Sequence, residues 1–158
     1  MKARTFISMM VMLITMVSMT ACENEDNPVD IPVDNKIIGT WSLYGFGTIG
    51  EDKVQEVNDK LEKWWLDKRF TLVFMGDGTL KGQTWANEVL GEYKIHGNII
   101  EFANLRTTLM AEQNDGEKYY NALLSVTHFE IKGDQLLLYY NDQQNYLLFD
   151  NVEKILEE

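Results

Sequence analysis

Short, β-rich runs separated by glycine-containing turns are the feature that most constrains how residues 37–150 fold. In the first run, residues 37–46, Trp41 and Leu43 alternate on one face. Alternation with a period of two is typical of strands with one buried face. The turns around Gly78, Gly97 and Gly133 favour antiparallel hairpins, because glycine accepts the positive φ that tight turns require. Further strands are predicted over residues 70–74, 79–85, 89–96, 99–102, 127–131, 135–140 and 146–149.

Two segments show helical spacing instead. In residues 51–66, Val54, Val57 and Leu61 recur at helical intervals, followed by Trp64 or Trp65. In the second segment, Asp115 precedes a face formed by Tyr119, Leu123 and Val126, and an aspartate at that position can cap a helix. We therefore predict one helix in each segment.

Together these elements predict a mainly β (α+β) fold. Strands joined by hairpins, with two helices inserted at the long connections, favour a curved antiparallel sheet or a small, partly open, lipocalin-like barrel. Its expected core consists of Trp41, Phe74, Tyr93, Phe102 and Leu138. Residues 151–158 form an acidic C-terminal tail in which a terminal helical turn is expected.

The N-terminal residues 1–21 have the organisation of a signal peptide. Lys2 and Arg4 precede an apolar run over residues 6–19, which is shorter than the roughly 20 residues that a membrane-spanning helix needs. The residues that follow, Thr20 and Ala21, are small and stand before Cys22. This segment resembles the lipobox of bacterial lipoproteins, which implies thioether diacylation and N-acylation of Cys22 after cleavage.

Cys22 is the sole cysteine of the chain. It therefore has no internal disulfide partner, and an incidental cysteine after an ordinary signal peptide is the weaker interpretation. Several acyl chains would hold the mature protein stably on a membrane. We expect an outer-membrane lipoprotein that faces either the periplasm or the cell surface.

Residues 22–36 are predicted to form a lipidated tether. Their acidic, amide and proline residues supply too few apolar groups to build a core. The acidic cluster at residues 23–26 also resembles the export signal of surface lipoproteins in some Gram-negative lineages. A solvated spacer explains the same residues, and both interpretations stay open.

The globular region carries a series of short motifs in a fixed order. They are Phe74, Asp77-Gly78, Gly82, Ala86-Asn87, Gly91-Glu92-Tyr93, residues 108–112, Glu117, Tyr120, Ala122, Leu123, Gly133-Asp134, Leu136, Leu138 and Phe149. In this order they resemble the META domain of heat-inducible and other bacterial envelope lipoproteins. The resemblance implies a fold and an envelope location, and no general enzymatic activity attaches to this family. Ala86 and Glu112 stand where many members carry two cysteines, so no disulfide or thiol role transfers.

The charge and the ionisable residues argue against several classes of function. The formal net charge of −11 becomes −13 once the two cations Lys2 and Arg4 leave with the signal peptide, so nucleic acid is not an expected partner. His96 and His128 lie in no catalytic or zinc-binding motif. Asp77, Asp134 and Asp142 are in short turns, where aspartate is common without calcium. We predict no catalytic residue, cofactor or metal.

Two functions remain open. The first is a non-enzymatic envelope-stress or protein-interaction module, for which the ring of Trp64 or Trp65 is a possible contact point. The alternative is a carrier of a small hydrophobic ligand, because Gly39-Thr40-Trp41 is similar to the opening of lipocalin-like barrels. A tightly packed aromatic interior would favour the first function, and a void would favour the second.

Overall fold

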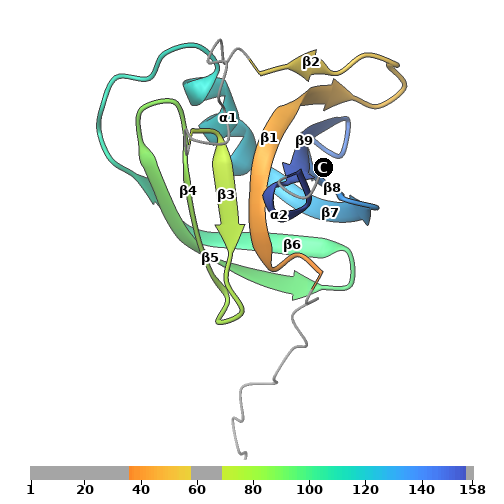
Figure 1. Ribbon diagram of the computed structural model, residues 1–158, viewed down its shortest axis with the longest axis horizontal. Coiled ribbons are helices and arrows are strands. Elements are labelled where there is room, and N and C mark those ends of the chain that lie inside the picture. Colours follow the sequence, from red (N-terminus) through yellow and green to blue (C-terminus); the bar gives the residue numbers. More distant parts are fainter. Residues whose placement is uncertain (1–35, 58–68, 156–158) are drawn as a thin grey trace, which may run out of the picture. The chain divides into compact units, whose positions relative to one another are not determined.

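The computed structural model describes residues 36–57 and 69–155 of the chain, and these residues form an antiparallel β-barrel with short helices (Figure 1). The helices are α1 (Gly116–Leu123) and α2 (Val152–Ile155). The strands are β1 (Gly39–Thr48), β2 (Gln55–Glu56), β3 (Thr71–Phe74), β4 (Thr79–Gln83), β5 (Glu88–His96), β6 (Ile99–Thr107), β7 (Val126–Lys132), β8 (Gln135–Tyr140) and β9 (Asn145–Asn151).

The barrel closes because β1 pairs with strands on both of its sides. Its first half pairs with β3, and most of its length pairs with β9, from Trp41 opposite Asn151 to Thr48 opposite Asn145. The other neighbours follow in chain order from β3 to β9, so eight strands form the wall and β2 extends it beside β1. The junction of β6 with β7 is the shortest, with the single residue pair Ile99 and His128.

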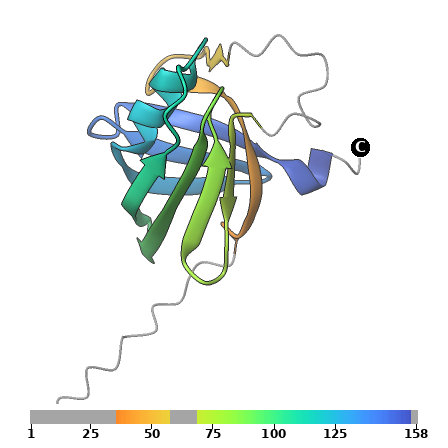
Figure 2. The same cartoon turned by 90° about the vertical axis from the view of Figure 1, so that its left-hand side faces the viewer.

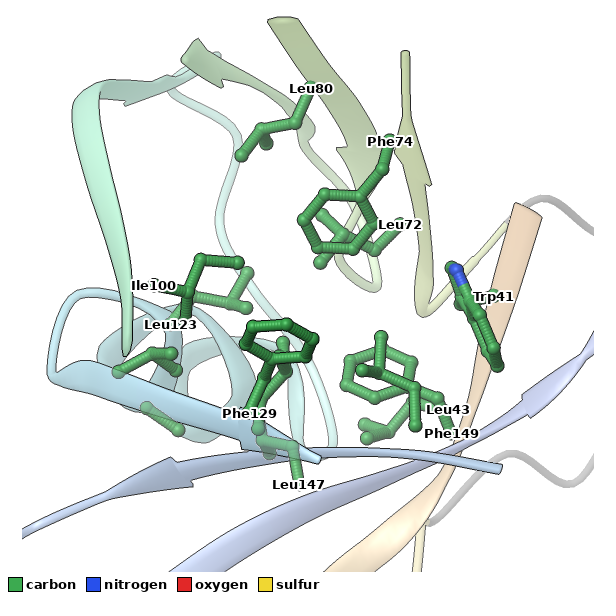
Figure 3. Close-up of a cluster of buried hydrophobic side chains, with 14 of the residues drawn as sticks. Trp41, Leu43, Leu72, Phe74, Leu80, Ile100, Leu123, Phe129, Leu147 and Phe149 are labelled. Atoms are coloured by element: carbon green, nitrogen blue, oxygen red, sulfur yellow. The ribbon is translucent and has the colours of Figure 1, made fainter. Parts of the chain in front are cut away.

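Large apolar side chains fill the barrel interior (Figure 3). The expected core residues Trp41, Phe74, Tyr93 and Leu138 are all buried, and Phe102 is partly buried against them. The indole Nε1 of Trp41 donates a hydrogen bond to the Ile37 carbonyl, which satisfies its polar group inside the core. The predicted mainly β, lipocalin-like barrel is therefore confirmed.

Helix α1 covers one end of the barrel, and β1 begins at the opposite end (Figures 1 and 2). Tyr119 projects from α1 into the barrel, where its ring centroid lies 5.9 Å from that of Phe70 and 6.1 Å from that of Phe149. Ala122 and Leu123 are buried on the same face of the helix. This end is thus closed by apolar packing.

One glycine on the outer face of β1 makes room for an aromatic ring. A Cβ atom at Gly47 would lie 2.0 Å from Cζ of Tyr146, the residue opposite it on β9. The Tyr146 ring in turn lies 6.1 Å, centroid to centroid, from the ring of Tyr139 on β8. Glycine at position 47 therefore lets this pair of rings lie against the barrel wall.

The predicted helix over residues 51–66 is wrong for its described part. Gln55 and Glu56 form strand β2, which pairs with Phe46 and Gly45 of β1. A Cβ atom at Gly45 would lie 2.3 Å from the Gln55 carbonyl oxygen, so the missing side chain allows the segment to approach β1 closely. Val54 contacts this glycine, which explains its apolar character without a helix. Residues 58–66, including Trp64 and Trp65, lie outside the described residues.

The second predicted helix is confirmed with different ends. Asp115 occupies the N-cap position of α1 without a capping side-chain hydrogen bond, and the helix ends at Leu123. Val126 therefore does not share its face and instead begins β7. The expected C-terminal helical turn is α2. Cys22, the predicted signal peptide of residues 1–21 and the predicted tether up to residue 35 lie outside the described residues.

Candidate interaction surface

The turn between β4 and β5 contains the two polar side chains that are buried among the described residues, Thr84 and Asn87. The Thr84 amide donates to the Asn87 carbonyl at 2.8 Å, and the Asn87 amide donates to Thr84 Oγ1 at 2.9 Å. These reciprocal bonds hold the turn in one conformation. They also fix the direction in which the Asn87 side chain points.

The Asn87 side chain holds the loop that follows β6. Its Oδ1 accepts hydrogen bonds from the Met110 amide at 2.7 Å and from Thr108 Oγ1 at 2.8 Å. Its Nδ2 donates to the Met110 carbonyl at 2.8 Å. Because only 3% of Asn87 is exposed, these bonds form away from bulk water, where an unpaired amide would be costly. The loop is therefore fixed at both polar atoms of the Met110 backbone.

The Glu112 carboxylate joins the same network. It accepts hydrogen bonds from Thr84 Oγ1, from Asn87 Nδ2 and, at 3.2 Å, from the Ala86 amide. A Cβ atom at Gly116 would lie 2.0 Å from Glu112 Oε2, so glycine at the start of α1 leaves space for the carboxylate. Ala86 and Glu112, which are 26 residues apart in sequence, are thus in direct contact through the hydrogen bond from the Ala86 amide.

The loop presents apolar side chains to solvent even though its backbone is held. Leu109 is fully exposed, at 100%, and Met110 is 66% exposed. Both line a hollow of about 330 Å³ at the barrel end covered by α1, which we call the Leu109 hollow. Its lining residues are Asn87, Thr107, Thr108, Leu109, Met110, Ala111, Glu112, Glu117 and Tyr120. An exposed apolar side chain on a constrained loop is a typical protein contact point, because little conformational entropy is lost on binding.

The sequence analysis named Asn87 and residues 108–112 only as motif residues, and did not identify this surface. The signal was present in the family motifs, since Ala86-Asn87 and residues 108–112 are two of them. What the sequence did not reveal is that these motifs, more than 20 residues apart, hydrogen-bond to each other and leave Leu109 outside.

The histidines and turn aspartates have ordinary environments. His96 is exposed at the β5–β6 turn, and His128 is partly exposed on β7 with its Nδ1 2.9 Å from Thr127 Oγ1. Asp77 Oδ1 accepts hydrogen bonds from the hydroxyl and the amide of Thr79, and these bonds lower the pKa of the carboxyl. Among the residues that the structure describes, no group of three or more His, Cys, Asp or Glu side chains could hold a metal ion.

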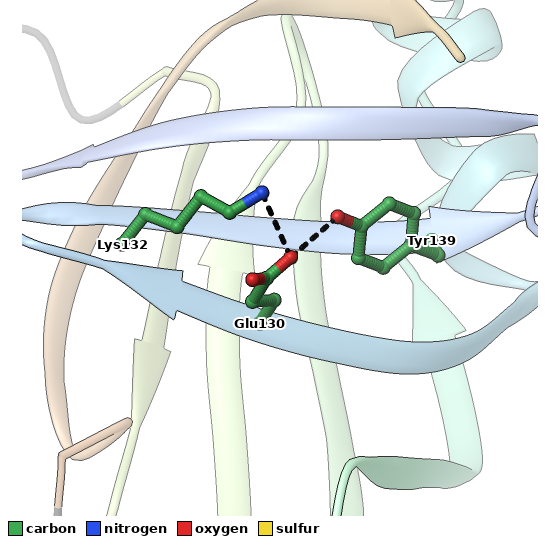
Figure 4. Close-up of polar contacts among 3 residues, drawn as sticks. All are labelled: Glu130, Lys132 and Tyr139. Carbon is green, nitrogen blue, oxygen red and sulfur yellow. Dashed lines mark hydrogen bonds and ion pairs between the residues drawn. The ribbon is translucent and has the colours of Figure 1, made fainter.

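A second polar cluster lies on the outer face of β7 and β8 (Figure 4). The Tyr139 hydroxyl donates to Glu130 Oε2 at 2.8 Å, and Lys132 Nζ lies 3.0 Å from the same oxygen. Hydrogen bonds from Lys132 and Tyr139 lower the pKa of Glu130. Burial, with the hydrogen bond and charge of Glu130, raises the pKa of Tyr139 to about 12. These residues are paired with one another.

Comparisons with known proteins relate this barrel to one family. The family model described as META domain matches residues 38–153. A DUF4847 family protein from Bacteroides vulgatus has a similar structure, with a TM-score of 0.54 and 18% identity over 73% of this chain and 95% of that one. A protein from Burkholderia xenovorans also has a TM-score of 0.54, with 22% identity over 72% of this chain and 81% of that one. No curated protein sequence matches. In the described part of the chain, no helix has the length and apolar character to cross a membrane.

Proposed function

Because this chain belongs to the META domain family, we propose that it is a non-enzymatic, lipid-anchored envelope lipoprotein that binds another protein through the Leu109 hollow. The observation that carries the proposal is the exposure of Leu109 on a loop whose backbone is held by the buried Asn87 side chain. Leu109 and Met110 are adjacent, both are exposed and both line the hollow, so they form a shared apolar surface and not a single exposed side chain.

The packed interior supports an interaction module over a ligand carrier. Trp41, Phe74 and Phe149 are each no more than 1% exposed and occupy the space that a carried ligand would need (Figure 3). Small carriers of the lipocalin type keep a cavity inside the barrel. The Leu109 hollow, in contrast, is formed by the loop and α1 outside this core.

The N-terminal sequence supports the lipid anchor and the envelope location. Cys22 follows a signal-peptide sequence and is the sole cysteine, and an acidic segment separates it from the barrel. In this proposal Cys22 carries the acyl chains in the outer membrane. β1 begins at the end of the barrel opposite α1, which is also the end opposite the Leu109 hollow (Figure 1).

Site-specific photocrosslinking in cells tests the partner. p-Benzoylphenylalanine replaces Leu109 in the full-length chain, and the matched control carries it at Ile49, which is 57% exposed at the end of β1. Irradiation is expected to give a discrete protein adduct from position 109 and none from position 49. Absence of a position-specific adduct at 109 would contradict the proposed interaction.

Metabolic labelling tests the anchor. Radiolabelled palmitate is expected to label the wild-type chain in the outer-membrane fraction, and a Cys22→Ser variant is expected to lose both the label and membrane attachment. Labelling that persists in this variant would rule out Cys22 as the acylated residue.

A further inference from the structure

The Leu109 hollow is acidic as well as apolar. Its lining contains two carboxylates, those of Glu112 and Glu117, and no lysine, arginine or histidine. The Glu112 carboxylate accepts three hydrogen bonds, all from uncharged donors. In the described part of the protein, residues 36–57 and 69–155, neither carboxylate of this surface is held in an ion pair.

The nearest cation in sequence points elsewhere. Lys118 directly follows Glu117, but its Nζ donates to Gln55 Oε1 at 2.8 Å and lies 3.8 Å from the centroid of the Phe46 ring. Lys118 is thus engaged with β1 and β2 on a different side of α1. Glu117 remains exposed at the rim of the hollow, where a cation from another molecule can reach it.

We propose that the Leu109 hollow binds a protein segment that carries a lysine or arginine next to an apolar side chain, which deepens the function proposed above and rests on it. The apolar side chain packs against Leu109 and Met110, and the cation contacts Glu117, with Glu112 adding to the negative field. Such a segment complements both the negative charge and the apolar side chains of the hollow.

Two other occupants match the surface less well. A second copy of this chain has a net charge of −11 and would bring negative charge toward negative charge. An anionic lipid surface is repelled for the same reason. A basic and apolar protein segment satisfies both features of the hollow.

Selection from a phage-displayed library of random heptapeptides tests the inference. The target is the full-length chain in mild detergent, and binding of the selected peptides is then measured by fluorescence polarisation. We expect enrichment of peptides with lysine or arginine within two residues of a leucine, isoleucine, valine or aromatic residue. Leu109→Ala should weaken their binding about tenfold, as loss of an apolar anchor does. Glu117→Gln should weaken it about three- to fivefold, which is the range for a partly exposed ion pair.

Salt dependence and a control variant separate charge recognition from a general effect. Raising the salt concentration should weaken peptide binding to the wild type more than peptide binding to Glu117→Gln, because salt screens the attraction between Glu117 and the cation of the peptide, which the variant lacks. Ile49→Ser alters an exposed apolar residue that does not line the hollow and should leave binding unchanged.

The outcomes also separate this inference from the proposed function. Peptides that depend on Leu109 but carry no cation, or that bind Glu117→Gln equally well, would overturn the inference and leave the interaction surface in place. Peptides that do not depend on Leu109, or no enrichment at all, would overturn the inference, while the photocrosslink at position 109 decides the proposed function independently.

Discussion

Removal of the Asn87 side chain should release the loop that follows β6 and lower the stability of the whole barrel. Asn87→Ala deletes the hydrogen bonds to Thr108, Met110 and Glu112. Each such bond contributes about 0.5–1.5 kcal/mol net, and buried partners that lose their bonds add to the cost. Because these hydrogen bonds are partly buried, we expect a loss of about 2–4 kcal/mol from the free energy of unfolding.

Urea denaturation measures this loss. With a slope of about 2 kcal/mol per molar urea, the midpoint should fall by about 1–2 M. Asn121→Ala is the matched control, because Asn121 is exposed on α1 and should change stability by less than about 0.5 kcal/mol. If the midpoints of the two variants agree within about 0.3 M, the reasoning that Asn87 holds the loop is refuted.

Three further predictions concern the barrel wall. Ultraviolet titration of the wild type, compared with Tyr139→Phe, should assign a pKa of about 12 to Tyr139, so the contribution of Tyr139 to stability is complete below pH 10 and disappears as the pH rises through about 12. Glu130→Gln should lower the pKa of Tyr139, although burial still raises it above its ordinary value, and an unchanged pKa would refute the coupling of the two side chains. Because β6 and β7 share only one residue pair, the amides of β6 that follow Ile99 and face β7 should exchange their hydrogens faster than amides in the middle of β8. Equal protection of the two sets of amides would contradict the short junction. Gly47→Ala should cost about 1–3 kcal/mol in the wild type and clearly less in a Tyr146→Ala background, whereas equal costs would exclude the ring as the cause.

The strands could be predicted well from the sequence because each carries its own local signal. β8 was predicted with its observed ends, and alternation placed Trp41 and Leu43 on the buried face of β1. Turn glycines at positions 78, 97 and 133 all have positive φ, which is the property that makes them recognisable. Local patterns of this kind predict the structure correctly because the pairing of the two strands in each hairpin favours the same conformation as the local sequence.

The helix predicted over residues 51–66 shows where local pattern fails. Val54 and Val57 have helical spacing, but the absence of a side chain at Gly45 allows Gln55 and Glu56 to pair with β1 as a strand. That preference depends on a contact between two separate segments, which periodicity within one segment does not encode. Tertiary pairing therefore overrode the helical pattern in the described part.

The candidate site was hidden from the sequence for a related reason. Asn87 is an ordinary turn residue in sequence, and only the folded chain brings its amide to Met110 and Glu112. Residues 108–112 were identified only as a motif of the family resemblance, and the structure exposes Leu109 completely. An apolar residue by itself does not reveal which way its side chain points.

Native mass spectrometry of residues 27–158, purified without detergent from a bacterial envelope extract, tests the central claim most directly. A barrel filled by its own side chains should give the mass of the bare polypeptide, with any associated species having the mass of a protein. A stoichiometric adduct with the discrete mass of a small molecule would contradict the packed interaction module and favour a ligand carrier.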